Sequence, residues 1–134
     1  MCLRRRAVQL GKPNRVVLIG DSRIRQLRDG LISHLSGVEL DTYMNSTTSD
    51  DHRMYKSHER TVKRLRDAKL HNDFFWTVEM DAGDGALGQT LRTIEKFSLK
   101  PDIIIIGSGV WIMKDCTAKN ISQVTCLDTF QRSV

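Results

Sequence analysis

Two short, unbroken apolar runs stand out along the chain, at residues 16–19 and 103–106. Such runs, rich in β-branched residues and followed by glycine, are typical of strands buried on both faces of a parallel sheet. Residues 73–78 are apolar and aromatic and predict another strand. Residues 38–44 alternate between polar and apolar positions and predict a further short strand.

Helices are predicted where apolar positions recur every three or four residues. One such helix follows the first strand and ends near Gly37, and its apolar stripe comprises Ile24, Leu27, Leu31 and Leu35. A later stripe comprises Leu87, Leu91, Ile94 and Phe97. The same spacing predicts helices over residues 55–70, with Val62 and Leu65 inward, and from residue 118 to the end.

This alternation of strands and helices predicts an α/β domain with a mainly parallel sheet flanked by helices. The domain occupies residues 16–134, and residues 1–15 are expected to form a flexible basic N-terminus. Parallel strands place their carboxyl ends at one edge of a sheet. The loops after Ile19, Val78 and Ile106 are therefore expected to converge there.

Composition fits a single soluble domain, with 134 residues, 40% hydrophobic and 28% charged. The net charge of +5 raises the question of nucleic acid binding. However, the basic residues are scattered, and only two Trp, two Tyr and four Phe are available for stacking. We expect a solvated basic surface and no nucleic acid partner, and an anionic sugar would also suit this charge.

The cysteines at positions 2, 116 and 126 form no metal-binding pattern and no even disulfide framework, so no metal site is predicted. A Cys116–Cys126 bridge requires an oxidising compartment and a turn between the two residues. No stretch approaches the ~20 apolar residues of a membrane span, and residues 1–10 lack the apolar core of a secretory signal. Two Asn-x-Ser/Thr triplets, at residues 45–47 and 120–122, fit a luminal protein.

Candidate chemistry lies at Ser22, where the first strand turns into a helix. Gly20 ends the strand, and Asp21 and Ser22 are both residues that favour a helix N-cap. Unpaired N–H groups at a helix start can receive the oxyanion that forms when a hydroxyl attacks a carbonyl. The structural alternative is a plain strand–turn–helix junction in which Asp21 or Ser22 only caps the helix.

The longer pattern resembles a known superfamily. Gly20-Asp21-Ser22 after an apolar strand resembles the first block of the SGNH (GDSL-type) hydrolases. Residues 20–27, GDSRIRQL, are similar to the N-terminal SGNH domain of the sialate O-acetyltransferases of the animal Golgi. Residues 73–76 followed by Gly85 and Gln89, and residues 101–111, match in order and spacing. The resemblance runs from about Val16 to about Ser122.

The resemblance implies a three-layer α/β/α, flavodoxin-like fold. It also implies that Ser22 is the nucleophile and that its backbone N–H is one oxyanion donor. Gly85 is implied as the second donor, with Gly83 and Gly88 as alternatives. Most SGNH hydrolases carry Gly-x-Asn-Asp in the third block, whereas this chain has Gly-Ser-Gly-Val at residues 107–110 and lacks the Asn, as the sialate-acetyltransferase branch also does.

Other residues near these blocks are candidates for substrate contact, namely Arg23, Arg25, Ser108 and Trp111. A solvated helix face explains Arg23 and Arg25 equally well. Packing is the commoner role for Trp111, as it is for Trp76. We assign helix capping or loop support, and no proton transfer, to Asp21.

A general base is missing from this pattern. The resemblance implies an Asp-x-x-His pair late in the domain, but no histidine here follows an aspartate at that spacing. His52 is the one stand-in, and an exposed loop histidine is the simpler interpretation of it. Two hypotheses follow: the chain is the front portion of a longer domain, truncated before its C-terminal part, or it is a stand-alone remnant.

Three functions remain open. By resemblance, the first is an O-acyltransferase that acetylates a carbohydrate hydroxyl, of the sialic-acid kind, through an acyl-serine. Acetyl-CoA would be its donor, with no tightly bound cofactor. The second is an acylesterase of the same superfamily, and the third is a non-catalytic carbohydrate-binding module. The resemblance implies a Golgi location, where the full-length family members are membrane-bound. No glycine-rich phosphate motif follows the first strand, which excludes a nucleotide loop there.

Overall fold

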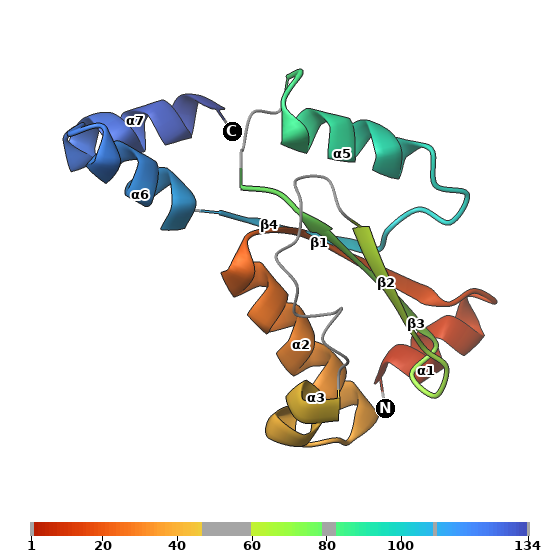
Figure 1. Ribbon diagram of the computed structural model, residues 1–134. Helices are drawn as coiled ribbons and strands as arrows, with labels where there is room; N and C mark the ends of the chain where they lie inside the picture. The colour runs from red at the N-terminus through yellow and green to blue at the C-terminus, as the bar shows by residue number, and fades with distance from the viewer. Residues whose placement is uncertain (1, 47–59, 79–82, 109, 134) are drawn as a thin grey trace.

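The computed structural model describes residues 2–46, 60–78, 83–108 and 110–133 (Figure 1). Its strands are β1 (Asn14–Gly20), β2 (Arg60–Leu65), β3 (Leu70–Trp76) and β4 (Ile103–Gly107). Its helices are α1 (Cys2–Gln9), α2 (Ser22–Ser36), α3 (Leu40–Ser46), α5 (Ala86–Glu95), α6 (Val110–Ala118) and α7 (Gln123–Ser133). The chain is therefore an α/β protein, as the alternation of patterns predicts.

The sheet has the strand order β2-β3-β1-β4, with β1 at its centre. Strand β1 runs parallel to both neighbours, so that Val17 lies beside Asp73 on one side and beside Ile104 on the other. Strand β2 is antiparallel to β3 and forms one edge. The sheet is thus mixed, and its three parallel strands end at a common edge, to the left in Figure 1.

Helices cover both faces of the sheet (Figure 1). Val17 and Ile19 of β1 pack toward α5, where they meet Leu87 and Ile94. The alternate residues of β1 pack in a second cluster with Phe74, Ile24 and Leu35, the last two from α2. Burial of each such side chain contributes about 1.5–3 kcal/mol. The central strand is apolar at every position from 16 to 19 because both of its faces are buried.

A buried ion cluster lies on the α5 face of the sheet. Asp73 is fully buried, and its Oδ2 accepts from Nε of Arg15 at 2.7 Å. Its Oδ1 accepts from Nε of Arg60 at 2.8 Å. The Arg15 guanidinium also lies 3.7 Å from the centre of the Phe97 ring. One carboxylate thereby joins residues of β1, β2 and β3.

Two sequence-based predictions of secondary structure are wrong. Residues 55–70 were expected to be helical, but β2, the turn that follows it and the first residue of β3 occupy the described part of this segment. Val62 and Leu65 fit one helix face by spacing, yet in the strand Leu65 packs inward and Val62 is exposed. Pairing with β3 decides the conformation. Residues 38–44 were expected to form a strand, but α3 begins at Leu40 and buries Tyr43.

The expected burial of residues 103–106 is also wrong. Strand β4 is parallel as predicted, but it forms an edge of the described sheet. Ile103, Ile104 and Ile106 are 52%, 43% and 45% exposed, whereas Ile105 packs against the α2-side cluster. An apolar run indicates a strand, but it does not indicate how many neighbours that strand has.

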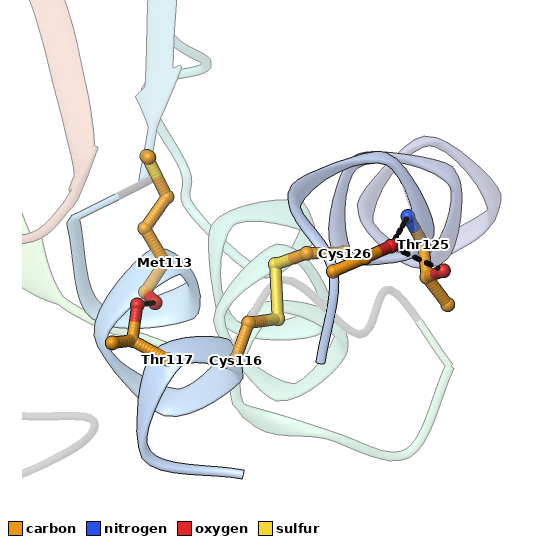
Figure 2. Close-up of a disulfide and its surroundings, with 6 residues drawn as sticks. Met113, Cys116, Thr117, Thr125 and Cys126 are labelled. Carbon is orange, nitrogen blue, oxygen red and sulfur yellow. Dashed lines mark hydrogen bonds between the residues drawn. A yellow bond between two sulfur atoms is a disulfide. The ribbon is translucent and has the colours of Figure 1, made fainter. Parts of the chain in front are cut away.

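Helical segments flank the sheet at both ends of the chain. The segment expected to be a flexible N-terminus contains α1, and Arg6 of α1 forms an ion pair with Asp102 at 2.8 Å. Figure 2 shows the Cys116–Cys126 disulfide that joins α6 to α7. A turn with Asn120 at φ 53° separates the two helices, which supplies the reversal that this bridge needs. Within the described residues, no helix combines the length and apolarity needed to cross a membrane.

Candidate active site at the carboxyl edge of the sheet

Ser22 is the first residue of α2 and comes two residues after the end of β1. Asp21 is the N-cap, and its Oδ1 accepts from the backbone N–H of Arg23 at 2.9 Å. The role of helix cap that the sequence predicts for Asp21 is therefore confirmed. The Ser22 side chain is half-buried. Its backbone N–H lies in the first turn, where a helix supplies no internal acceptor.

The loops that follow the three parallel strands meet at this edge. The Thr77 N–H donates to the Gly20 carbonyl at 3.0 Å, which joins the end of β3 to the end of β1. The Ser108 hydroxyl donates to the Val78 carbonyl at 3.2 Å, which joins the loop after β4 to the loop after β3. Because β1 lies between β3 and β4, this second bond joins the loops that follow the two neighbours of β1. The predicted convergence of these loops is confirmed.

Close packing at the two strand ends explains the glycines there. Gly20 and Gly107 are register partners on β1 and β4. A Cβ on Gly20 would lie 1.9 Å from the Gly107 carbonyl oxygen and 2.6 Å from Cγ1 of Ile24. A Cβ on Gly107 would lie 2.5 Å from Cδ1 of Ile24. The first turn of α2 can approach the sheet this closely only because neither residue has a side chain.

Gly85 is the N-cap of α5, and among the described residues no side chain caps this helix. Of its two alternatives, Gly83 accepts from Nη1 of Arg92 through its carbonyl, and Gly88 is buried in the first turn of α5. Helix α5 begins after the loop that follows β3, so the N-termini of α2, α5 and α6 all follow strands that end at this edge. Their partial positive charges favour an anion there.

The candidate substrate contacts differ in how much of each side chain is available. Arg23 is exposed and Arg25 is half-buried, both in the first turn of α2. The Ser108 hydroxyl is engaged by the Val78 carbonyl, so its described role is to hold the loops together. Trp111 lies in α6, and its side chain is outside the described part of the structure.

No described histidine lies near Ser22. His34 is in the last turn of α2, twelve residues beyond Ser22, or ~18 Å along a helix. His71 is the second residue of β3 and lies beside Arg15, near the amino edge of the sheet. Burial, with Arg64 and Arg15 nearby, lowers the pKa of His71. His52, the one stand-in for a base, falls outside the described residues.

Asp21 has a feature that the sequence does not reveal. Its side chain is 2% exposed, and its second oxygen, Oδ2, is buried without a hydrogen-bond partner among the described residues. An unsatisfied buried carboxylate oxygen is costly, so it marks a position where an additional donor would be stabilised. The described residues contain no group of His, Cys, Asp and Glu able to hold a metal ion.

Comparison of the chain with known protein families, with curated proteins and with solved structures gave no match.

Proposed function

We propose that the chain is an SGNH-type O-acyltransferase domain with a three-layer, flavodoxin-like α/β/α fold. In this proposal Ser22 attacks the acetyl carbonyl of acetyl-CoA, the thiol leaves, and the acetyl group passes to a carbohydrate hydroxyl. The N–H groups of Ser22 and Gly85 receive the oxyanion. Arg23, Arg25, Ser108 and Trp111 are the proposed substrate contacts, and a sialic-acid-like sugar is the proposed acceptor.

One observation carries this proposal: Ser22 is half-buried at the start of α2, beside the point where three strand ends are joined. A serine in this place has helix-start N–H groups beside it, and the converging loops supply further backbone donors. Helices on both faces of the sheet support the three-layer arrangement.

The described residues contain no general base placed to accept the proton of the Ser22 hydroxyl. A serine hydroxyl needs a general base, and neither His34 nor His71 is placed to act as one. We therefore expect the chain by itself to have negligible transferase or esterase activity. This deficiency favours the alternative of a non-catalytic carbohydrate-binding module. The geometry supports acylesterase chemistry equally well, with water in place of the sugar.

A Golgi location remains part of the proposal. The Cys116–Cys126 disulfide supports it, because structural disulfides persist in oxidising compartments. Asn120 of the second triplet is exposed in the turn between α6 and α7, where a luminal enzyme could reach it.

The test supplies the missing base from solution. The chain is incubated with isotope-labelled acetyl-CoA, with and without added imidazole, and acetylated peptides are located by mass spectrometry. We expect imidazole to raise acetylation at Ser22 by at least about tenfold over the chain alone, since a positioned base contributes roughly 10²–10⁴ and a diffusing one less.

Two variants define the outcome. Ser22→Ala should lose the label, whereas Ser33→Ala, which removes another hydroxyl of the same helix, should keep it. Acetylation spread evenly over surface serines and lysines would overturn the proposal of a nucleophilic Ser22. Rapid turnover of an acetyl ester by the chain without imidazole, lost in Ser22→Ala, would instead refute the expectation that the isolated chain is inactive.

A further inference from the structure

A pocket of about 540 Å³ opens at the amino edge of the sheet, opposite the edge that holds Ser22. One wall is the end of α1 and the loop that leads into β1. The other wall is the end of β2, the turn that follows and the start of β3. These segments lie together at the lower right of Figure 1. A strand of seven residues separates the two edges by ~20 Å, so this pocket is independent of the proposed acyl-transfer site.

Positive charge dominates the pocket. Lys12, Arg64, Arg66 and Lys69 line it, and none of the described residues that line it is Asp or Glu. Within the described part of the chain, Arg64, Arg66 and Lys69 have no ion-pair partner, while Lys12 lies 3.4 Å from Asp102, which is shared with Arg6. A concave surface of one charge focuses the electrostatic potential and attracts ions of the opposite sign.

Backbone hydrogen bonds hold both walls in place. Helix α1 ends in a Schellman motif: the Lys12 N–H donates to the Ala7 carbonyl at 3.2 Å and the Gly11 N–H to the Val8 carbonyl at 3.3 Å. In the opposite wall the Lys69 N–H donates to the Arg66 carbonyl at 3.1 Å. The Asn14 N–H donates to the Lys69 carbonyl at 2.9 Å, which ties the turn to β1. The basic side chains therefore extend from a fixed backbone frame, which lowers the cost of ordering them around a ligand.

The pKa of the His71 imidazole depends on the charges in this pocket. It lines the pocket and is half-buried. Burial lowers the pKa of His71, and the nearby charges of Arg64 and Arg15 lower it further, against the opposing effect of Asp73. A bound anion would act in the opposite direction, because negative charge stabilises the protonated imidazole.

We propose that this pocket binds the diphosphate group of a small molecule, either free diphosphate or a nucleoside diphosphate. Arg and Lys are the side chains that best recognise phosphate oxygens, and several cations match a ligand that carries several negative charges. The volume lies within the range of small-molecule sites. The apolar residues Val8, Pro13 and Leu65 also line the pocket, and they can contact the uncharged part of a ligand. The charges come from side chains, so no glycine-rich phosphate loop is needed.

Calorimetric titration with pyrophosphate, ADP and adenosine, in a buffer of physiological ionic strength, tests the proposal. We expect pyrophosphate and ADP to bind and adenosine not to bind. Tighter binding of ADP identifies a nucleoside diphosphate as the ligand class, and equal binding identifies free diphosphate. Failure of both diphosphates to bind at millimolar concentration, or binding of adenosine as tight as that of ADP, would overturn the proposal.

Variants distinguish a built pocket from diffuse surface charge. Arg64→Gln and Lys69→Gln should each weaken pyrophosphate binding by about tenfold, the effect of losing one charge-assisted contact of about 1.4 kcal/mol. Lys96→Gln, at the exposed end of α5, is the matched control and should change binding by less than about twofold. An equal effect of all three substitutions would contradict a specific site.

NMR titration of the imidazole rings gives a second readout. Pyrophosphate should raise the pKa of His71, which lines the pocket. At a pyrophosphate concentration near the wild-type Kd, the His71 response should be several-fold smaller in Arg64→Gln, because binding about tenfold weaker leaves most of that variant unoccupied. An unchanged pKa of His71 in the presence of bound pyrophosphate would place the ligand elsewhere and refute the assignment.

Discussion

Single residues decide whether the candidate site can form, and Gly20 is the most tightly constrained of them. The Gly107 carbonyl oxygen and the Ile24 side chain occupy the space in which a Cβ on Gly20 would lie. The sequence shows that a glycine ends this strand, but only the strand order places Gly107 beside it. Ser22 and Asp21 owe their positions at the edge of the sheet to this contact.

We predict that Gly20→Ala lowers the free energy of unfolding by about 3 kcal/mol or more, because a Cβ at 1.9 Å from a backbone oxygen forces the two strands apart. Gly30→Ala is the control in α2. A Cβ at Gly30 meets nothing within 4 Å, and alanine favours a helix, so stability should rise by up to ~1 kcal/mol. Urea denaturation of both variants checks this, and an equal effect of the two substitutions would contradict the packing argument.

At the scale of elements, polar side chains fix how the strands and helices join. Asp73 accepts from Arg15 of β1 and Arg60 of β2, and all three lie on the α5 face. A buried carboxylate with two guanidinium partners disfavours other strand registers, because a shifted register would leave buried charge unpaired. Near the C-terminus, the Cys116–Cys126 disulfide links α6 to α7.

Removal of the disulfide should loosen the α6–α7 hairpin and leave the sheet intact. The bridge spans a sequence separation of 10 residues, for which the chain-entropy account gives ~3 kcal/mol. We expect Cys116→Ser with Cys126→Ser to accelerate amide hydrogen exchange in α7 by about a hundredfold. Cys2→Ser removes the exposed free thiol and is the control. Unchanged protection of α7 in the double variant would show that helix packing alone holds the hairpin.

At the scale of the whole molecule, Asp102 joins segments that are far apart in the sequence. Asp102 lies just before β4. Its carboxylate accepts from the side chain of Arg6 in α1 at 2.8 Å and from the backbone N–H of Arg15 in β1 at 2.8 Å. The Arg6 hydrogen bond is the main cause that lowers the pKa of Asp102 from 3.8 to about 2. The amino-terminal helix is therefore attached to the sheet through a charge that titrates in acid.

Asp102→Asn should destabilise the protein by about 1 kcal/mol at neutral pH, the value of a partly exposed charged hydrogen-bond pair. Because folding depresses the pKa of Asp102, its stabilising effect is present above 3.8 and is lost as the pH falls toward about 2. The difference between wild type and variant should therefore shrink across that interval in denaturant titrations. Asp128→Asn, exposed on α7, is the control. A difference that does not change with pH would refute this role.

Much of the candidate site was predictable because it depends on local chain properties. An apolar run, a glycine and two capping residues fix a strand–turn–helix junction, so the position of Ser22 and the capping role of Asp21 follow from adjacent residues. The engagement of the Ser108 hydroxyl by Val78 and the unpaired Oδ2 of Asp21 were not predictable. Both features depend on which segments, distant in the sequence, pack around these two side chains.

The sequence by itself determined the α/β class, the cores of β1, β3, α2 and α5, and the serine at a helix start. Apolar periodicity reports these features because it arises within one segment. The tertiary structure alone decided that residues 60–65 pair as an antiparallel edge, that β4 is exposed, and that basic residues from α1 and the β2–β3 turn share one pocket. Strand pairing and charge clustering involve residues distant in the chain, and no local pattern encodes which of them will meet.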